Sequence, residues 1–118
     1  MRKILIVDDA PTVLSIVEFT LKEAGYQVEK AENALEAKSK VQAQSFDVGI
    51  FDINMPGQNG IDLTRDVLQM ANGKGMKIIM LTTESSADLK ARGKEAGAIG
   101  WLTKPFESQD LLGLLERV

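Results

Sequence analysis

The chain has 118 residues, enough for one domain with a substantial core and too few for two. The net charge is −3 and the basic residues are scattered, so the sequence has no basic patch suited to binding nucleic acid. The lack of cysteine and histidine excludes disulfides, thiolate metal sites and histidine-based catalysis. The N-terminus lacks the apolar core of a signal peptide, and no stretch approaches the ~20 apolar residues of a membrane span. We therefore expect one cytoplasmic domain over residues 1–118 that binds neither nucleic acid nor membranes.

Short apolar runs alternate with amphipathic segments along the whole chain. The apolar runs predict strands near residues 3–7, 27–31, 47–52, 77–82 and 99–103. The segments between and after them have the helical period and predict helices over 11–24, 34–43, 61–71, 86–96 and 107–118. Strands that alternate with helices of this length indicate an α/β domain with a parallel sheet covered on both faces.

The apolar positions of the first three helices indicate which faces are buried. The first helix should bury Val13, Ile16, Val17, Leu21 and Ala24; the second Ala34, Ala37 and Val41; the third Ile61, Thr64, Leu68 and Ala71, with Leu63 and Val67 beside them. Glycines at 25 and 97 are typical helix stop signals after the first and fourth helices.

Five polar residues lie at or just past the ends of predicted strands: Asp8, Asp9, Asp52, Thr82 and Lys104. Because the carboxyl ends of parallel strands form one edge of the sheet, where ligands bind in such folds, these side chains should meet there. Three carboxylates packed together repel and would partly protonate unless a cation lay among them. The pattern therefore favours a divalent ion with oxygen ligands, with Lys104 as a second positive charge.

These motifs resemble the receiver domain of two-component response regulators. The matching residues are Asp8-Asp9, Asp52 with Met55-Pro56 and Asn59-Gly60, Thr82, and Lys104-Pro105-Phe106. Within that family, residues 81–85 and 96–101 look most like stand-alone chemotaxis regulators of the CheY type. The resemblance implies a flavodoxin-like (βα)5 doubly wound fold with five parallel strands in the order 2-1-3-4-5, the order known for CheY.

The resemblance also implies a phosphoryl site. Asp52 would accept a phosphoryl group from a histidine kinase, which a carboxylate can do without a histidine of its own. Mg²⁺ would be held by Asp8, Asp9, Asp52 and the backbone carbonyl of Asn54. The chain would catalyse only its own phosphorylation and dephosphorylation, so it is not expected to be a turnover enzyme.

Further roles follow from the same resemblance. Lys104, preceding a cis bond to Pro105, would neutralise phosphoryl oxygens, and Thr82 would donate a hydrogen bond to one of them. Thr82 and Trp101 would act as the switch, with the aromatic ring changing rotamer on phosphorylation. Asn54 and Glu84 would modulate dephosphorylation and access for partners. The implied partners are the kinase, a flagellar motor switch protein and a phosphatase. Phosphorylation would shift the fourth helix, fifth strand and fifth helix between two populations.

Structural roles remain open for each of these residues. Asp52 could cap a turn, one of the acidic pair could cap the helix at Pro11, and Lys104 could be solvated. Thr82 and Trp101 could be packing residues of strands. Two other functions are also open: a phosphatase with an aspartyl nucleophile, which typically has a second acid where this chain has Asn54, and a docking module that is never phosphorylated.

Overall fold

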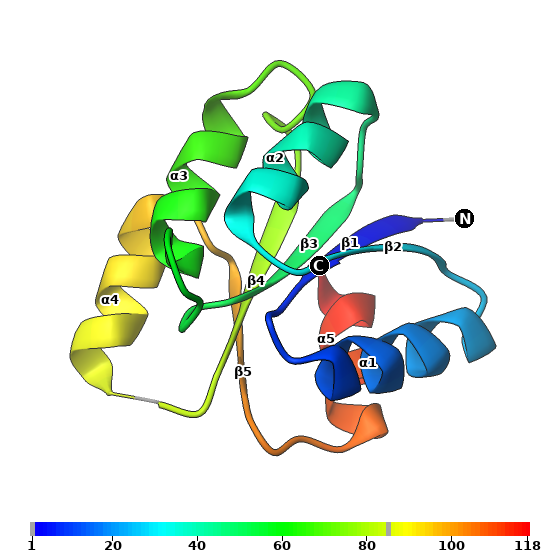
Figure 1. Cartoon of the computed structure of the whole chain (residues 1–118). Helices are drawn as coiled ribbons and strands as arrows, with labels where there is room; N and C mark the ends of the chain where they lie inside the picture. The colour runs from blue at the N-terminus through cyan, green and yellow to red at the C-terminus, as the bar shows by residue number, and fades with distance from the viewer. Residues whose placement is uncertain (1, 85) are drawn as a thin grey trace.

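The computed structural model describes residues 2–84 and 86–118, and within them strands and helices alternate throughout (Figure 1). The elements are β1 (Lys3–Val7), α1 (Pro11–Glu23), β2 (Gln27–Ala31), α2 (Ala34–Ala43), β3 (Val48–Asp52), α3 (Gly60–Gln69), β4 (Lys77–Thr82), α4 (Ala87–Ala96), β5 (Gly100–Thr103) and α5 (Ser108–Arg117). Each predicted element is present. The largest boundary error is at α3, which ends at Gln69 rather than at residue 71.

The strands form one parallel sheet in the order β2-β1-β3-β4-β5, which confirms the predicted flavodoxin-like topology. The chain first moves outward from β1 to β2 and then returns to the other side of β1 with β3. The order of strands therefore reverses between β1 and β3, and ligands of such sheets bind beyond the carboxyl ends of the strands at this point.

The helices cover both faces of the sheet, with α1 and α5 on one side and α2, α3 and α4 on the other (Figure 1). Successive side chains of a strand point to opposite faces, so the core has two layers. Ile79 and Leu81 of β4 pack in the layer under α1 and α5, whereas Ile78 and Met80 pack in the layer under α2, α3 and α4. This burial on both faces explains the continuous apolar runs of β1, β3 and β4.

The buried face of α1 differs from the predicted one. Leu14, Val17 and Leu21 are buried, whereas Ile16 is 56% exposed and Ala24 lies in the exposed cap after the helix. Leu14, Val17 and Leu21 are three and four residues apart and so form a single stripe toward the sheet. Ile16 lies about 100° around the helix from Val17 and therefore faces outward.

The second and third helices follow the sequence pattern more closely. The three predicted residues of α2 are all buried, and in α3 Ile61, Leu63, Thr64 and Val67 are buried. Leu68 is only partly buried, and Ala71 is exposed because α3 ends before it.

Arg2 connects the two ends of the chain at the amino edge of the sheet. Its guanidinium donates a hydrogen bond of 2.8 Å to the carbonyl of Leu115 and another to the carbonyl of Val118. Carbonyls in the last turn of a helix lack partners within the helix, and a positive charge there also suits the helix dipole. Arg2 thus fixes the end of α5 against the start of β1.

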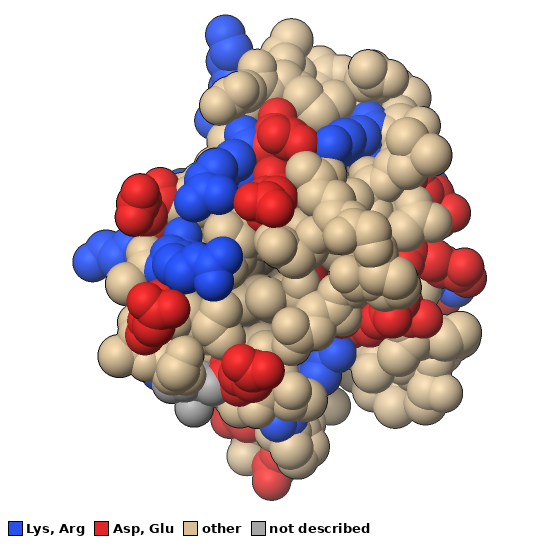
Figure 2. Space-filling view, turned by 60° about the vertical axis from the view of Figure 1, so that its left-hand side comes forward, with Lys and Arg blue, Asp and Glu red and all other residues tan. Residues whose placement is uncertain are grey.

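The molecular surface carries charged side chains of both signs, as the small net charge of the sequence leads one to expect. On the face shown in Figure 2, lysine and arginine side chains lie among aspartate and glutamate side chains. None of the helices within the described part of the chain has the length and hydrophobicity needed to cross a membrane.

Candidate functional site

Four of the predicted site residues meet at the carboxyl edge of the sheet. One carboxylate oxygen from each of Asp8, Asp9 and Asp52 lies within 4.8 Å of the other two. The Nζ atom of Lys104 lies 2.7 Å from Oδ2 of Asp8 and 3.4 Å from Oδ1 of Asp52. The strand order explains this meeting, because Asp8 follows β1, Asp52 ends its neighbour β3, and Lys104 follows β5.

The three carboxylates differ in their exposure to solvent. Asp8 is fully buried and Asp52 is 4% exposed, whereas Asp9 is exposed. Oδ1 of Asp8 accepts a hydrogen bond of 2.9 Å from the backbone N–H of Ala10. Ala10 is itself the N-cap of α1, and no side chain caps this helix. Helix capping therefore does not account for the acidic pair.

The surroundings of Asp52 favour its neutral form. Burial in the protein, and next the negative charge of Asp8, raise the pKa of the Asp52 carboxyl to about 6, although Lys104 opposes this shift. Burial alone would lower the pKa of Lys104, but its hydrogen bond to Asp8 and the charge of Asp52 outweigh this effect and raise the pKa. Lys104 therefore stays protonated, and its ammonium pairs with two of the three carboxylates, Asp8 and Asp52.

This donor set fits a hard divalent cation. Carboxylate oxygens are the ligands that Mg²⁺ prefers, and Mg²⁺ sites typically use one or two carboxylates and keep several waters. Exposed Asp9 leaves the cluster open to solvent on one side. Asn54 lies two residues beyond the end of β3 in the loop toward α3, where it is exposed, and its carbonyl as a ligand stays a prediction.

Thr82 is fully buried at the end of β4, next to the strand that carries Asp52. Its Oγ1 accepts a hydrogen bond of 3.1 Å from the backbone N–H of Glu84, which leaves the hydroxyl proton available to donate elsewhere. The carbonyl of Thr82 accepts a hydrogen bond of 2.7 Å from the backbone N–H of Lys104. The ends of β4 and β5 are thus joined directly at the site, and the bond between Lys104 and Pro105 is cis, as expected.

Trp101 lies on the α4 side of the sheet, as the alternation of side chains along β5 predicts. It is paired in register with Met80 of β4 and is partly buried against the core layer that includes Met80. Its Nε1 atom is buried and has no hydrogen-bond partner among residues 2–84 and 86–118. Packing, rather than hydrogen bonding, therefore holds the ring.

Gly60 supports the site in a way that the sequence did not reveal. A Cβ atom at this position would lie 2.2 Å from the backbone carbonyl oxygen of Asp52, so only glycine allows the start of α3 to pack this closely on β3. Its N–H also donates a hydrogen bond of 3.0 Å to the carbonyl of Ile53. The pair Asn59-Gly60 was the available signal, but its contact with Asp52 depends on the tertiary fold.

An apolar groove of about 350 Å³ opens beside Lys104, between α1 and the loop from β5 to α5. Its lining residues are Val13, Ile16, Val17, Thr83, Lys104, Pro105 and Phe106. The exposed Ile16 thus forms part of the wall of a groove that leads toward the site.

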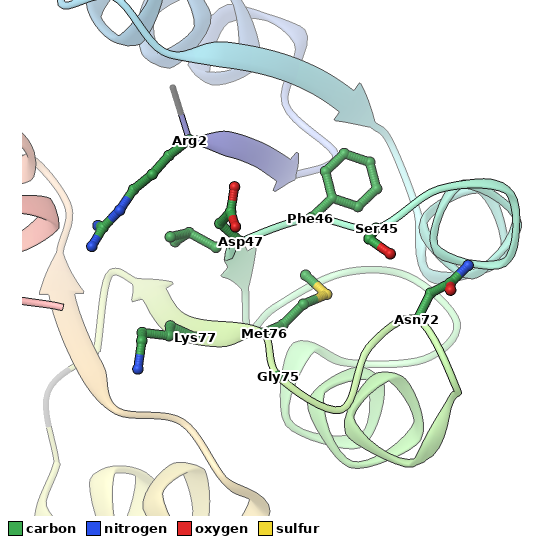
Figure 3. Close-up of a pocket in the computed structure, with 9 residues that line it drawn as sticks. Arg2, Ser45, Phe46, Asp47, Asn72, Gly75, Met76 and Lys77 are labelled. Carbon is green, nitrogen blue, oxygen red and sulfur yellow. The ribbon is translucent and has the colours of Figure 1, made fainter.

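A second pocket, shown in Figure 3, lies at the amino end of the sheet and is separate from the site. It is bounded by Ser45, Phe46 and Asp47 before β3 and by Met76 and Lys77 near the start of β4. Arg2 extends away from Phe46 here, consistent with its hydrogen bonds to the end of α5. Nothing in this pocket resembles the carboxylate cluster, so we assign it no role.

Comparison with known proteins agrees with the fold and with the family that the sequence resembles. The family model for the response regulator receiver domain matches residues 4–116, and the chain belongs to this family. Protein PilH of Pseudomonas aeruginosa is 37% identical over 118 residues, covering 100% of this chain and 98% of that protein.

Solved structures give the same result. The chemotaxis protein CheY4 of Vibrio cholerae, crystallised at low pH, has a TM-score of 0.97 and 45% sequence identity, with 100% of this chain and 98% of that chain covered. A CheY-like receiver domain protein of Methanospirillum hungatei has a TM-score of 0.93 and 32% identity, with 99% and 92% covered. The chain is therefore a CheY-like receiver.

Proposed function

We propose that this chain is a phosphoacceptor response regulator, phosphorylated on Asp52 by a histidine kinase. The observation that carries the proposal is the burial of the Asp52 carboxylate beside Lys104, Asp8 and Asp9 at the switch point of the sheet. A carboxylate buried among like charges costs stability, so a purely structural role does not explain the cluster.

The residues of the site would act in distinct ways during phosphoryl transfer. An Oδ atom of Asp52 attacks phosphorus, the bond from phosphorus to the kinase imidazole breaks, and an acyl phosphate forms on Asp52. Lys104 lies close enough to Asp52 to stabilise the charge of the phosphoryl oxygens, and Thr82 can turn its hydroxyl toward them. Asp8, Asp9, Asp52 and the carbonyl of Asn54 would hold Mg²⁺, which neutralises phosphoryl charge when bound.

The output would be a change in protein contacts. Phosphorylation on Asp52 shifts the populations of two arrangements of α4, β5 and α5, and a partner reads the favoured one. The likeness to the chemotaxis protein of Vibrio cholerae supports a chemotaxis-type pathway, in which a flagellar motor switch protein and a phosphatase are the expected partners. Residues 1–118 would act as a single receiver domain.

Intact-mass spectrometry with acetyl phosphate as donor tests the proposal. Wild type should gain the mass of one phosphoryl group only in the presence of Mg²⁺, and Asp52→Asn should gain none. Asp88→Asn is the control, since Asp88 is exposed in the first turn of α4, and it should behave as wild type. Equal phosphate incorporation by Asp52→Asn would overturn the assignment. Sustained turnover of phosphomonoesters would instead identify a phosphatase, and no mass gain in wild type would favour a docking module.

A further inference from the structure

Gly93 occupies an unusual position in the middle of α4. Glycine is among the least favourable residues in a helix interior, and an alanine there would normally stabilise the helix. The backbone does not require glycine at this point, because the glycines with positive φ in the described chain are Gly25, Gly57 and Gly97. The reason for Gly93 must therefore lie in what surrounds it.

The neighbours of Gly93 are the side chains of Trp101 and Met80. A Cβ atom added at Gly93 would lie 3.1 Å from Cζ3 of Trp101 and 3.4 Å from Cγ of Met80. The first distance is tighter than ordinary van der Waals contact, so the indole ring would have to move. Nε1 of Trp101 has no hydrogen-bond partner among the described residues, so the movement of the ring would be resisted by its packing against the core layer that includes Met80.

We propose that Gly93 is a positioning residue for Trp101. Because Gly93 has no side chain, the indole ring stays half-buried against the backbone of α4, and this affects the equilibrium between the positions of the ring. This inference rests on the proposed function, because the switch matters only if Asp52 is phosphorylated. A methyl group at position 93 pushes the ring outward, toward the surface beside Lys90 and Lys94.

The connection from Gly93 to the phosphoryl site runs along β4. The side chain of Met80 lies next to Gly93, and Met80 is paired in register with Trp101 on the neighbouring strand. Thr82 lies two residues further along the same strand, so its side chain points to the same face of the sheet as that of Met80. Occupation of the phosphoryl site favours a ring that is more buried than in this structure, so a ring displaced outward should weaken binding at the site.

Thermal stability separates a steric role of Gly93 from simple helix propensity. Gly113 is the matched control, because it lies in the interior of α5 and a Cβ atom there meets nothing within 4 Å. Gly113→Ala should raise the melting temperature, whereas Gly93→Ala should lower it. In a Trp101→Phe background, where the ring lacks the Cζ3 atom, Gly93→Ala should raise the melting temperature as Gly113→Ala does. The same gain from Gly93→Ala with and without Trp101 would overturn the assignment.

Folding of the variants gives a further check. If Gly93→Ala alone does not fold, the double variant with Trp101→Phe should fold, and failure of both would overturn the steric explanation. In folded Gly93→Ala the emission of Trp101 should shift to longer wavelength and iodide should quench it more strongly. Gly113→Ala should match wild type, and unchanged emission and quenching in Gly93→Ala would contradict the proposal.

Binding of beryllofluoride with Mg²⁺ tests the link to the phosphoryl site. Gly93→Ala should bind beryllofluoride about fivefold more weakly than wild type, a modest allosteric coupling, and Gly113→Ala should bind as wild type does. Equal affinities of Gly93→Ala and wild type would overturn the coupling and leave the proposed function intact. No binding by wild type would overturn the proposed function as well, while the melting temperatures would still decide whether Gly93 positions the ring.

Discussion

The ammonium group of Lys104 lies 2.7 Å from the carboxylate of Asp8, although 96 residues separate the two along the chain. Asp8 is fully buried and the side chain of Lys104 is only 18% exposed. This ion pair joins the loop after β5 to the end of β1. The same ammonium pairs with the buried carboxylate of Asp8 and lies close to Asp52. Removal of Lys104 should therefore change both the stability of the protein and the electrostatic environment of Asp52.

Lys104→Met should destabilise the protein by about 3 kcal/mol at neutral pH without Mg²⁺, since it leaves a buried charge without its partner. Urea unfolding measures the change in the free energy of unfolding. Lys22→Met is a matched control, because Lys22 pairs with Glu18 through a side chain that is 57% exposed, and its loss should cost less than about 1 kcal/mol. Equal losses in the two variants would show that the Lys104 pair contributes no more than a surface pair.

Asp52→Asn should stabilise the protein at neutral pH in the presence of EDTA. The pKa of Asp52 is raised from 3.8 to about 6 in the folded state, so between these values the folded protein holds a proton that the unfolded chain has lost. Stability of wild type therefore falls as pH rises through this window, by at most about 3 kcal/mol from this group.

The difference between Asp52→Asn and wild type should follow the same window. It should be nearly constant below about pH 3, grow between about pH 3 and pH 7, and stay at its maximum above about pH 7, as measured by urea unfolding at each pH. A difference that does not change with pH would show that the Asp52 carboxyl titrates as it does in the unfolded chain.

Mg²⁺ should raise the melting temperature of wild type, because a ligand that binds only the folded state stabilises it by mass action. Asp9→Ala should lose most of this response and should be more stable than wild type without metal, since one of three repelling carboxylates is gone. Asp88→Ala removes an exposed carboxylate outside the cluster and should keep the full response. An equal shift in Asp9→Ala would mean that the metal binds elsewhere.

Trp101 should report occupation of the site by beryllofluoride, a mimic of the phosphoryl group. If Thr82 turns toward the bound group, space opens beside the ring and Trp101 becomes more buried. Its emission should then change and iodide should quench it less, and Thr82→Ser, which keeps the hydroxyl, should preserve the response while Thr82→Ala weakens it. Unchanged fluorescence in a complex whose formation is verified by fluorine NMR would leave Trp101 as a packing residue.

The α/β class and the meeting of the acidic residues were predictable because both follow from local patterns, whereas the strand order 2-1-3-4-5 was predicted from the resemblance to receiver domains. Alternating strands and helices require a parallel sheet, and a parallel sheet brings the residues after its strands to one edge. The positions of Asp8, Asp9 and Lys104 directly after predicted strands were enough to predict that they meet at this edge. Their separate exposures were not predictable, since burial of Asp8 and exposure of Asp9 depend on how the loop after β1 turns.

Other features depended on contacts between elements that no local pattern encodes. Ile16 and Leu14 are both apolar and only two residues apart, and the sheet decides which of them is buried. A glycine inside α4 is unfavourable by helix propensity alone, and its closeness to Trp101 becomes visible only in the folded structure. The raised pKa of Asp52 likewise results from burial and from Asp8, a residue that follows another strand.

The hydrogen bonds from Arg2 to the carbonyls of Leu115 and Val118 hold the start of β1 next to the end of α5. Both lie at the amino edge of the sheet, across the domain from Asp52. Adjacent ends are suited to circular permutation: a short linker could join them, and new ends could be opened in a surface loop. A fluorescent protein fused at either end would likewise start far from the carboxylates. The molecule thus offers an attachment point for sensors that leaves its acidic edge free.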